Sequence, residues 1–199
     1  MEYVISLMGF VLVSTITPGP NNLLLAASGI RYGFRRTLPH VVGVQSGVCM
    51  LVALCGIGLG QILLSAPMAM IVLKVFGTAY LMYLAWKIIG FVPVDSTADY
   101  AAPMTVVQAL IFQFSNPKAW MMATTGLNIS LGITDSMLIA VLLLCGGFAS
   151  LGVLCNFIWV MMGASLQRAF AVPLYRYWIN GFLAAITVAT VILLWLPLN

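Results

Sequence analysis

Two clusters of proline and amide side chains interrupt apolar stretches of this chain. The first consists of Thr17, Pro18, Gly19, Pro20, Asn21 and Asn22, and the second consists of Asn116, Pro117 and Lys118. Proline removes a backbone donor and clashes with the preceding turn, so each cluster should end one helix and begin another. The start of a half-helix offers free N–H groups and a partial positive charge, which suit a carboxylate. The alternative is a pair of kinks that only shape the protein.

Lys118 is a cation in an otherwise uncharged stretch that runs from Met104 to Asn128. An isolated cation in hydrocarbon costs about 2.5–3.5 kcal/mol on insertion scales. Lys118 lies roughly 21 Å from the start of this stretch at 1.5 Å per residue, so its ammonium could extend to the outer surface. We favour the other interpretation, in which the adjacent break supplies carbonyl partners and a cavity, and Lys118 pairs with a substrate carboxylate.

Further polar side chains interrupt other apolar stretches. Gln45 and Asn156 could join helices by hydrogen bonds worth about 0.6–2 kcal/mol each, or they could line a path through the membrane. Both interpretations stay open, and the cost of an unpaired amide favours the path for Asn156. His40, the sole histidine, is expected at the inner interface in a structural role. Lys74 is expected to extend to the outer surface.

The elements that must position these residues are membrane-spanning helices. Hydrophobic residues make up 63% of the 199 residues, charged residues make up 6%, and the mean hydropathy is +1.12, whereas a soluble domain carries about a quarter charged residues. Charged positions separate six apolar stretches: Tyr3–Ile30, Pro39–Leu64, Met68–Ile89, Met104–Leu127, Ser136–Leu166 and Tyr177–Leu196. Each reaches the roughly 20 residues that a helix needs to cross a bilayer. We predict an all-α integral membrane protein with six transmembrane helices, the first and fourth of them broken.

A single transport domain, residues 1–199, should contain two inverted three-helix repeats. Repeat one covers about 1–91 and repeat two about 104–199, and a cytoplasmic linker of about 92–103 joins them. An odd number of spans inverts the second copy, and Pro18 and Pro117 are 99 positions apart (117 − 18). Small residues let helices approach closely, and the glycines expected to do so are Gly43, Gly47, Gly77 and Gly181. They could also pack between protomers, as in a homodimer.

Basic residues indicate the orientation of these spans. The loop cations are Arg31, Arg35, Arg36, Lys87, Arg168 and Arg176. The opposite loops, Gln61–Pro67 and Asn128–Asp135, contain no lysine or arginine. By the positive-inside rule the basic side is cytoplasmic, so both termini should lie outside a cytoplasmic (inner) membrane. The start of the chain has no basic region, so no cleavable signal peptide is expected.

The sequence shows no signature of catalysis. It contains no Walker motif, no GxSxG and no HExxH. Its cysteines, Cys49, Cys55, Cys145 and Cys155, form no close CxxC pair, so no metal or redox cofactor is expected. The net charge of +4 comes from loop residues and does not point to nucleic acid. We expect a protein that is not an enzyme and needs no cofactor.

The motifs in their order along the chain resemble one known family. The first break is followed by Gly33-Phe34-Arg35, the glycines Gly43 and Gly47, Gly77 with Tyr80-Leu81, and Asn116-Pro117-Lys118-Ala119. Together they resemble the lysine-exporter (LysE/RhtB) family of small amino-acid efflux proteins over essentially the whole chain. Phe112-Gln113-Phe114, Asn156-Phe157-Ile158-Trp159 and Gln167-Arg168 are most similar to its cysteine/O-acetylserine exporter branch. The resemblance implies inner-membrane secondary exporters of amino acids and derivatives that use the proton gradient.

One feature departs from that family. Some members carry an acidic residue after the second-span glycines, where this chain has Val48-Cys49. No aspartate or glutamate lies in any predicted span, so a carboxylate relay for protons is missing. Coupling would then use Lys118, His40, the substrate amine or water.

The sequence therefore predicts a secondary active exporter of a small zwitterionic or neutral amino acid. The substrate carboxylate would meet the half-helix start at Asn21 and Asn22, with Lys118 nearby. Access would alternate as two inverted halves rock within the lipid bilayer. Two alternatives stay open: a passive facilitator or channel, and a membrane scaffold that transports nothing.

Overall fold

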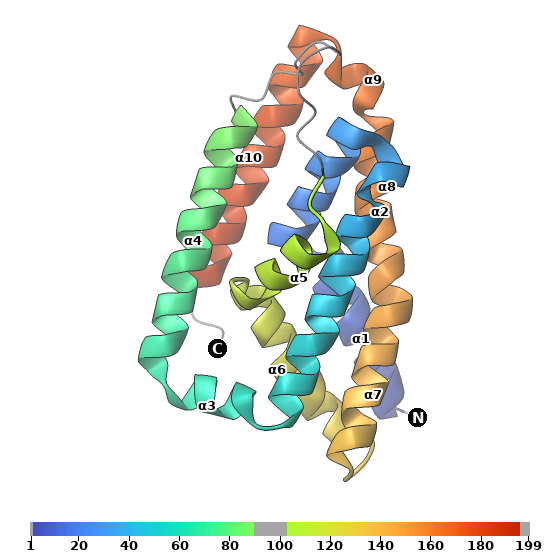
Figure 1. Ribbon diagram of the computed structural model, residues 1–199, viewed down its shortest axis with the longest axis vertical. Helices are drawn as coiled ribbons and strands as arrows, with labels where there is room; N and C mark the ends of the chain where they lie inside the picture. Colours follow the sequence, from blue (N-terminus) through green and yellow to red (C-terminus); the bar gives the residue numbers. More distant parts are fainter. Residues whose placement is uncertain (1, 90–102, 196–199) are drawn as a thin grey trace.

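Helices make up all of the regular structure in the part of the chain that the computed structural model describes, residues 2–89 and 103–195 (Figure 1). In chain order they are α1 (Glu2–Ile16), α2 (Pro20–Gly56), α3 (Leu59–Ser65), α4 (Pro67–Ile89), α5 (Val106–Phe114), α6 (Pro117–Leu131), α7 (Met137–Gly147), the π-helical η1 (Phe148–Gly152), α8 (Val153–Ser165), α9 (Gln167–Phe170) and α10 (Pro173–Trp195). This is the predicted all-α class. Apart from Pro103, the expected linker lies outside the described residues.

Both proline clusters end one helix and begin another. α1 ends at Ile16 and α2 begins at Pro20, while α5 ends at Phe114 and α6 begins at Pro117. Proline is well suited to the first position of a helix, because its missing N–H would have no partner there. In the first break this position belongs to Pro20, and Pro18 lies in the non-helical segment between the helices.

A glycine folds α2 back on itself. Gly33 has φ 75° and ψ 174° inside this 37-residue helix, a backbone conformation that favours glycine. The arms on either side lie close together, since Ser28 Oγ is 3.3 Å from His40 Nδ1. The loop expected between Ile30 and Pro39 is therefore wrong: this segment is helical apart from the kink, and Pro39 lies inside the second arm.

Two helical stretches of the described chain are long and apolar enough to cross a membrane. They are Pro20–Gly56, with a mean hydropathy of 1.7, and Met137–Ala169, with a mean hydropathy of 2.5. The second comprises α7, η1 and α8 in succession and continues into α9. These helices agree with a membrane protein, while the six-span arrangement stays a prediction.

Close approaches at glycine hold α2 against α8. A Cβ added at Gly29 would overlap the Val160 carbonyl, and one added at Gly163 would overlap the Ala26 carbonyl. The absence of side chains at these two positions therefore allows the backbones to cross directly. Neither glycine was among those expected to pack.

Three of the four expected packing glycines also lie at close approaches. Gly43 lies against the Val106 carbonyl and Gly47 against Gln113 Cγ, so the second arm of α2 packs on α5. A Cβ at Gly77 would lie 2.8 Å from Pro117 Cδ, which places α4 beside the second break. The expectation for Gly181 is not met within the described chain, where a Cβ would find no atom within 4 Å.

α4 and α10 pack as a pair along one side of the molecule (Figure 1). Trp195 Nε1 donates to Thr78 Oγ1 at 2.8 Å, and Lys74 Nζ lies 5.8 Å from the centroid of the Trp195 ring. Lys74 therefore has a cation–π contact, which the expected extension to the outer surface did not include.

A polar pocket between two helix breaks

Lys118 joins the two breaks, although they are a hundred positions apart. Its ammonium donates to the Thr17 carbonyl at 2.8 Å, to Thr17 Oγ1 at 3.0 Å and to the Pro18 carbonyl at 3.3 Å. The expected carbonyl partners are present, but they come from the first break and not from the adjacent one. In this conformation the ammonium is engaged with the protein.

Every carbonyl from Thr15 to Pro18 accepts a side-chain hydrogen bond. Asn22 Nδ2 donates to the Thr15 and Thr17 carbonyls at 2.7 and 2.8 Å. Trp159 Nε1 donates to the Ile16 carbonyl at 3.2 Å, and Lys118 reaches Pro18. Unpaired carbonyls in a membrane cost several kcal/mol each, so these donors make the interruption tolerable. Asn22 therefore satisfies two carbonyls of the break, and its expected contact with a carboxylate stays a prediction.

Side chains also satisfy the second break. The Asn116 side chain accepts from the Lys118 backbone N–H at 3.2 Å and so caps α6. Trp120 Nε1 donates to the Phe114 carbonyl at 3.0 Å. Asn116 thus begins the half-helix that carries Lys118 back toward the first break.

An amide pair connects the first break to α5. Asn21 Nδ2 donates to Gln113 Oε1 at 2.8 Å, and Gln113 Nε2 donates back to Asn21 Oδ1 at 3.0 Å. Gln113 also donates to the Ala109 carbonyl and is fully buried. Sequence reasoning did not select Gln113 as a site residue, although it is an amide inside an apolar stretch and belongs to one of the stretches that resemble the exporter branch.

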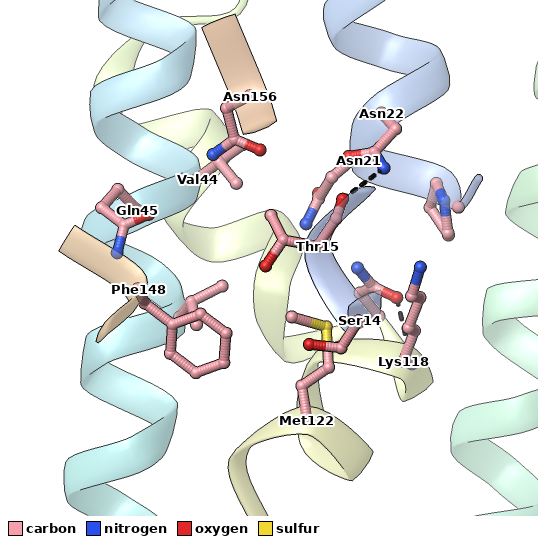
Figure 2. A pocket seen from close by; sticks show the side chains of 14 residues that line it. Ser14, Thr15, Asn21, Asn22, Val44, Gln45, Lys118, Met122, Phe148 and Asn156 are labelled. Carbon is pink, nitrogen blue, oxygen red and sulfur yellow. Dashed lines mark hydrogen bonds between the residues drawn. The ribbon is translucent and has the colours of Figure 1, made fainter. Parts of the chain in front are cut away.

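A pocket of about 30 Å³ lies beside these bonds (Figure 2). It is lined by Ser14, Thr15, Gly19, Pro20, Asn21, Asn22, Val44, Gln45, Val48, Asn116, Lys118, Met122, Phe148 and Asn156. This volume holds one to three water molecules, because each needs about 10–15 Å³ on this measure. The pocket must widen before an amino acid can enter.

Most of the residues expected at a site meet in this pocket. Gly19, Pro20, Asn21, Asn22, Gln45, Asn116, Lys118 and Asn156 line it, whereas Thr17, Pro18 and Pro117 do not. The lining residues that were not among the expected site residues are Ser14, Thr15, Val44, Val48, Met122 and Phe148. Ser14 and Thr15 shortly precede the first break, which was an available signal. Val48 had one as the position where some family members carry an acidic residue, and the other three apolar residues had none.

Few of the side chains that line the pocket are charged. Lys118 is the one charged side chain in its lining, and its ammonium is already bound. Among the described residues no acidic side chain lines the pocket, so none of them offers a counter-ion to an extra positive charge. In the described chain no three side chains of the kinds that bind metals come together.

His40 is buried among protein side chains, with its Nδ1 atom 3.3 Å from Ser28 Oγ. Its expected place at the inner interface stays a prediction. Its Nε2 atom has no hydrogen-bond partner among the described residues. His40 is one helical turn before Val44, which lines the pocket.

A polar pocket between two interrupted apolar helices is typical of membrane transport proteins. The chain belongs to the LysE type translocator family, which it matches over residues 12–196. A family of translocators agrees with a membrane protein that is not an enzyme.

Individual relatives are similar over most of their length. The chain is 32% identical over 182 residues to a cysteine/O-acetylserine efflux protein of Klebsiella pneumoniae, and the aligned region covers 90% of each chain. It is 30% identical over 162 residues to a cysteine/O-acetylserine efflux protein of Escherichia coli K12, and the aligned region covers 81% of this chain and 82% of the relative. No solved structure matches the chain.

Proposed function

We propose that the protein is a secondary active exporter of small amino acids or their derivatives across the cytoplasmic membrane. The observation that carries this proposal is the amide-rich pocket at the junction of the two helix breaks. Membership of a translocator family and relatives named as cysteine/O-acetylserine efflux proteins support amino-acid efflux.

The lining favours a small zwitterionic or neutral substrate. Its polar groups are amides and hydroxyls, and its apolar walls come from Val44, Val48, Met122 and Phe148. A basic substrate would bring an ammonium that no lining carboxylate can neutralise. The missing carboxylate supports the proposal that the pocket excludes lysine-like substrates.

The proposal includes six spans in two inverted repeats. α1 with the first arm of α2 would form the first span, and α5 with α6 would form the fourth. Two contacts support it: a Cβ at Gly47 would lie 2.8 Å from the Leu110 carbonyl, and one at Gly147 would lie 3.2 Å from Val11 Cγ2. Gly147 lies 100 positions after Gly47, and Val11 lies 99 positions before Leu110. The second contact therefore joins the positions that correspond to the first pair in the opposite repeats. Repeats related by a two-fold axis produce such paired contacts.

Alternating access would follow from movement between the halves. The pocket is too small for an amino acid in this conformation, so transport requires that its walls separate. The basic loop residues favour both termini outside. Proton coupling would use Lys118, His40, the substrate amine or water, because no acid lines the pocket.

Uptake into inverted membrane vesicles tests this proposal. Labelled cysteine, O-acetylserine, threonine and lysine would each be measured with and without a protonophore. We expect gradient-dependent accumulation of cysteine or O-acetylserine and none of lysine. Uptake that only reaches equal concentrations would instead identify a facilitator, and no uptake of any of the four would contradict the substrate class.

A further inference from the structure

The polar side chains of the pocket fall into two groups, bound and free. Asn21, Asn22 and Lys118, which the sequence indicated as ligands of a carboxylate, are already bound within the protein. Asn21 pairs with Gln113, while Asn22 and Lys118 donate to carbonyls of the first break. In this conformation the donors of these three side chains cannot turn to a substrate carboxylate without giving up bonds within the protein.

Thr15 and Asn156 belong to the free group. Thr15 is 8% exposed, and its buried hydroxyl has no hydrogen-bond partner among the described residues. Asn156 is 3% exposed, lines the same cavity, and its amide makes no hydrogen bond to another described residue. A fully buried hydroxyl without a partner is rare in proteins, so Thr15, with the unengaged Asn156 amide beside the same cavity, is poised for a ligand.

Gln45 completes this group. Its amide has one weak contact, from Nε2 to Cys49 Sγ at 3.6 Å, which leaves its oxygen and most of its donor capacity available. Thr15 lies on α1, Gln45 on the second arm of α2 and Asn156 on α8. Figure 2 shows Thr15 facing Gln45 and Asn156 across the pocket.

We propose that Thr15, Gln45 and Asn156 bind the polar groups of the transported amino acid, while Asn22 and Lys118 hold the broken helix in place. This assignment rests on the proposed export function and names the substrate contacts within it. Amides and hydroxyls both donate and accept, so the three side chains can bind a carboxylate and an ammonium at once. The ligand class is a zwitterionic amino acid whose side chain carries no net charge.

The two groups respond differently to substitution. Removal of a buried polar group whose partner stays behind destabilises a protein, whereas removal of a group that has no partner is neutral or stabilising. Thr15→Val and Asn156→Leu preserve shape and remove unpaired groups. Without substrate, both variants should therefore unfold at the wild-type temperature or above it. Both should also bind substrate more weakly than the wild type.

The test combines thermal unfolding of purified protein with O-acetylserine uptake into vesicles. We expect the apparent KM to rise at least tenfold for Thr15→Val and for Asn156→Leu, with no fall in unfolding temperature. Thr15→Ser keeps the hydroxyl and should restore a KM within about threefold of wild type. Thr190→Val is the matched control, because its hydroxyl bonds to the Ile186 carbonyl of its own helix, outside the pocket.

The outcomes separate this assignment from the export function. If wild type transports and both variants keep its KM, or if they lose stability and not affinity, the assignment is wrong while the function stands. If wild type neither accumulates O-acetylserine nor gains thermal stability from it, both the function and the assignment fail for this substrate.

Discussion

Lys118 supplies three hydrogen bonds to backbone and side-chain oxygens of the segment between α1 and α2, about a hundred positions earlier in the chain. A carbonyl end of a helix carries partial negative charge, so an ammonium is well placed there. Gly19 makes room for it, because a Cβ at that position would lie 3.0 Å from Lys118 Nζ. Lysine thus supplies donors to the Thr17 and Pro18 carbonyls, which lie where the helix is interrupted.

Lys118→Met should destabilise the protein by about 1–3 kcal/mol, because the Pro18 carbonyl loses its donor and Thr17 loses two contacts. Equilibrium unfolding in mixed micelles would measure this change. Lys118→Arg keeps a cation at the break and should recover part of the loss. Wild-type stability in Lys118→Met would show that the three bonds contribute nothing.

The amide pair between Asn21 and Gln113 should show energetic coupling. A double-mutant cycle with Asn21→Ala and Gln113→Ala is expected to give an interaction free energy of about 0.6–2 kcal/mol, the range for hydrogen bonds between membrane helices. The same unfolding assay reports it. Additive effects of the two substitutions would contradict the pairing.

At the scale of the element, glycine sets how the helices bend and how closely they cross. Gly33 folds α2 through a positive φ, and Gly163 lets α8 meet α2 at the Ala26 carbonyl. Gly181 lies in open space on α10. Gly33 is therefore required for its backbone conformation and Gly163 for close packing, whereas Gly181 is required for neither.

Gly163→Ala should lower the unfolding temperature, because the new methyl group overlaps the Ala26 carbonyl and forces α2 and α8 apart. Gly33→Ala should also destabilise, by about 1–2 kcal/mol, because alanine disfavours positive φ. Gly181→Ala is the control and should be neutral or slightly stabilising in a helix. Equal losses at Gly163 and Gly181 would contradict the crossing.

Local rules predicted the helix breaks and missed the long-range partners. Pro20 and Pro117 begin helices where the sequence indicated interruptions, because the effect of proline on its own backbone is local. The loop expected between Ile30 and Pro39 is reduced to a kink at Gly33, because one glycine turns the chain between two helical arms. Gln113 bonds a residue 92 positions away, and no local pattern encodes such a pairing. Its role emerges only when α5 packs on α2.

At the scale of the whole molecule, bonds between distant segments surround a pocket that is smaller than its proposed substrate. Asn21 with Gln113 and Lys118 with Thr17 connect the first third of the chain to its middle. Eight of the eleven residues expected at a site line this pocket, and their contact with a substrate stays a prediction. Their roles differed, because hydrogen bonding to the breaks occupies the amides and the cation that had looked like ligands.

Accumulation in proteoliposomes tests the central claim most directly. Purified protein would be reconstituted with an imposed pH gradient, and labelled O-acetylserine would be followed inside and outside the vesicles. An exporter coupled to protons should raise the internal concentration above the external one, and a protonophore should abolish the excess. Uptake that stops at equal concentrations in both conditions would contradict active export.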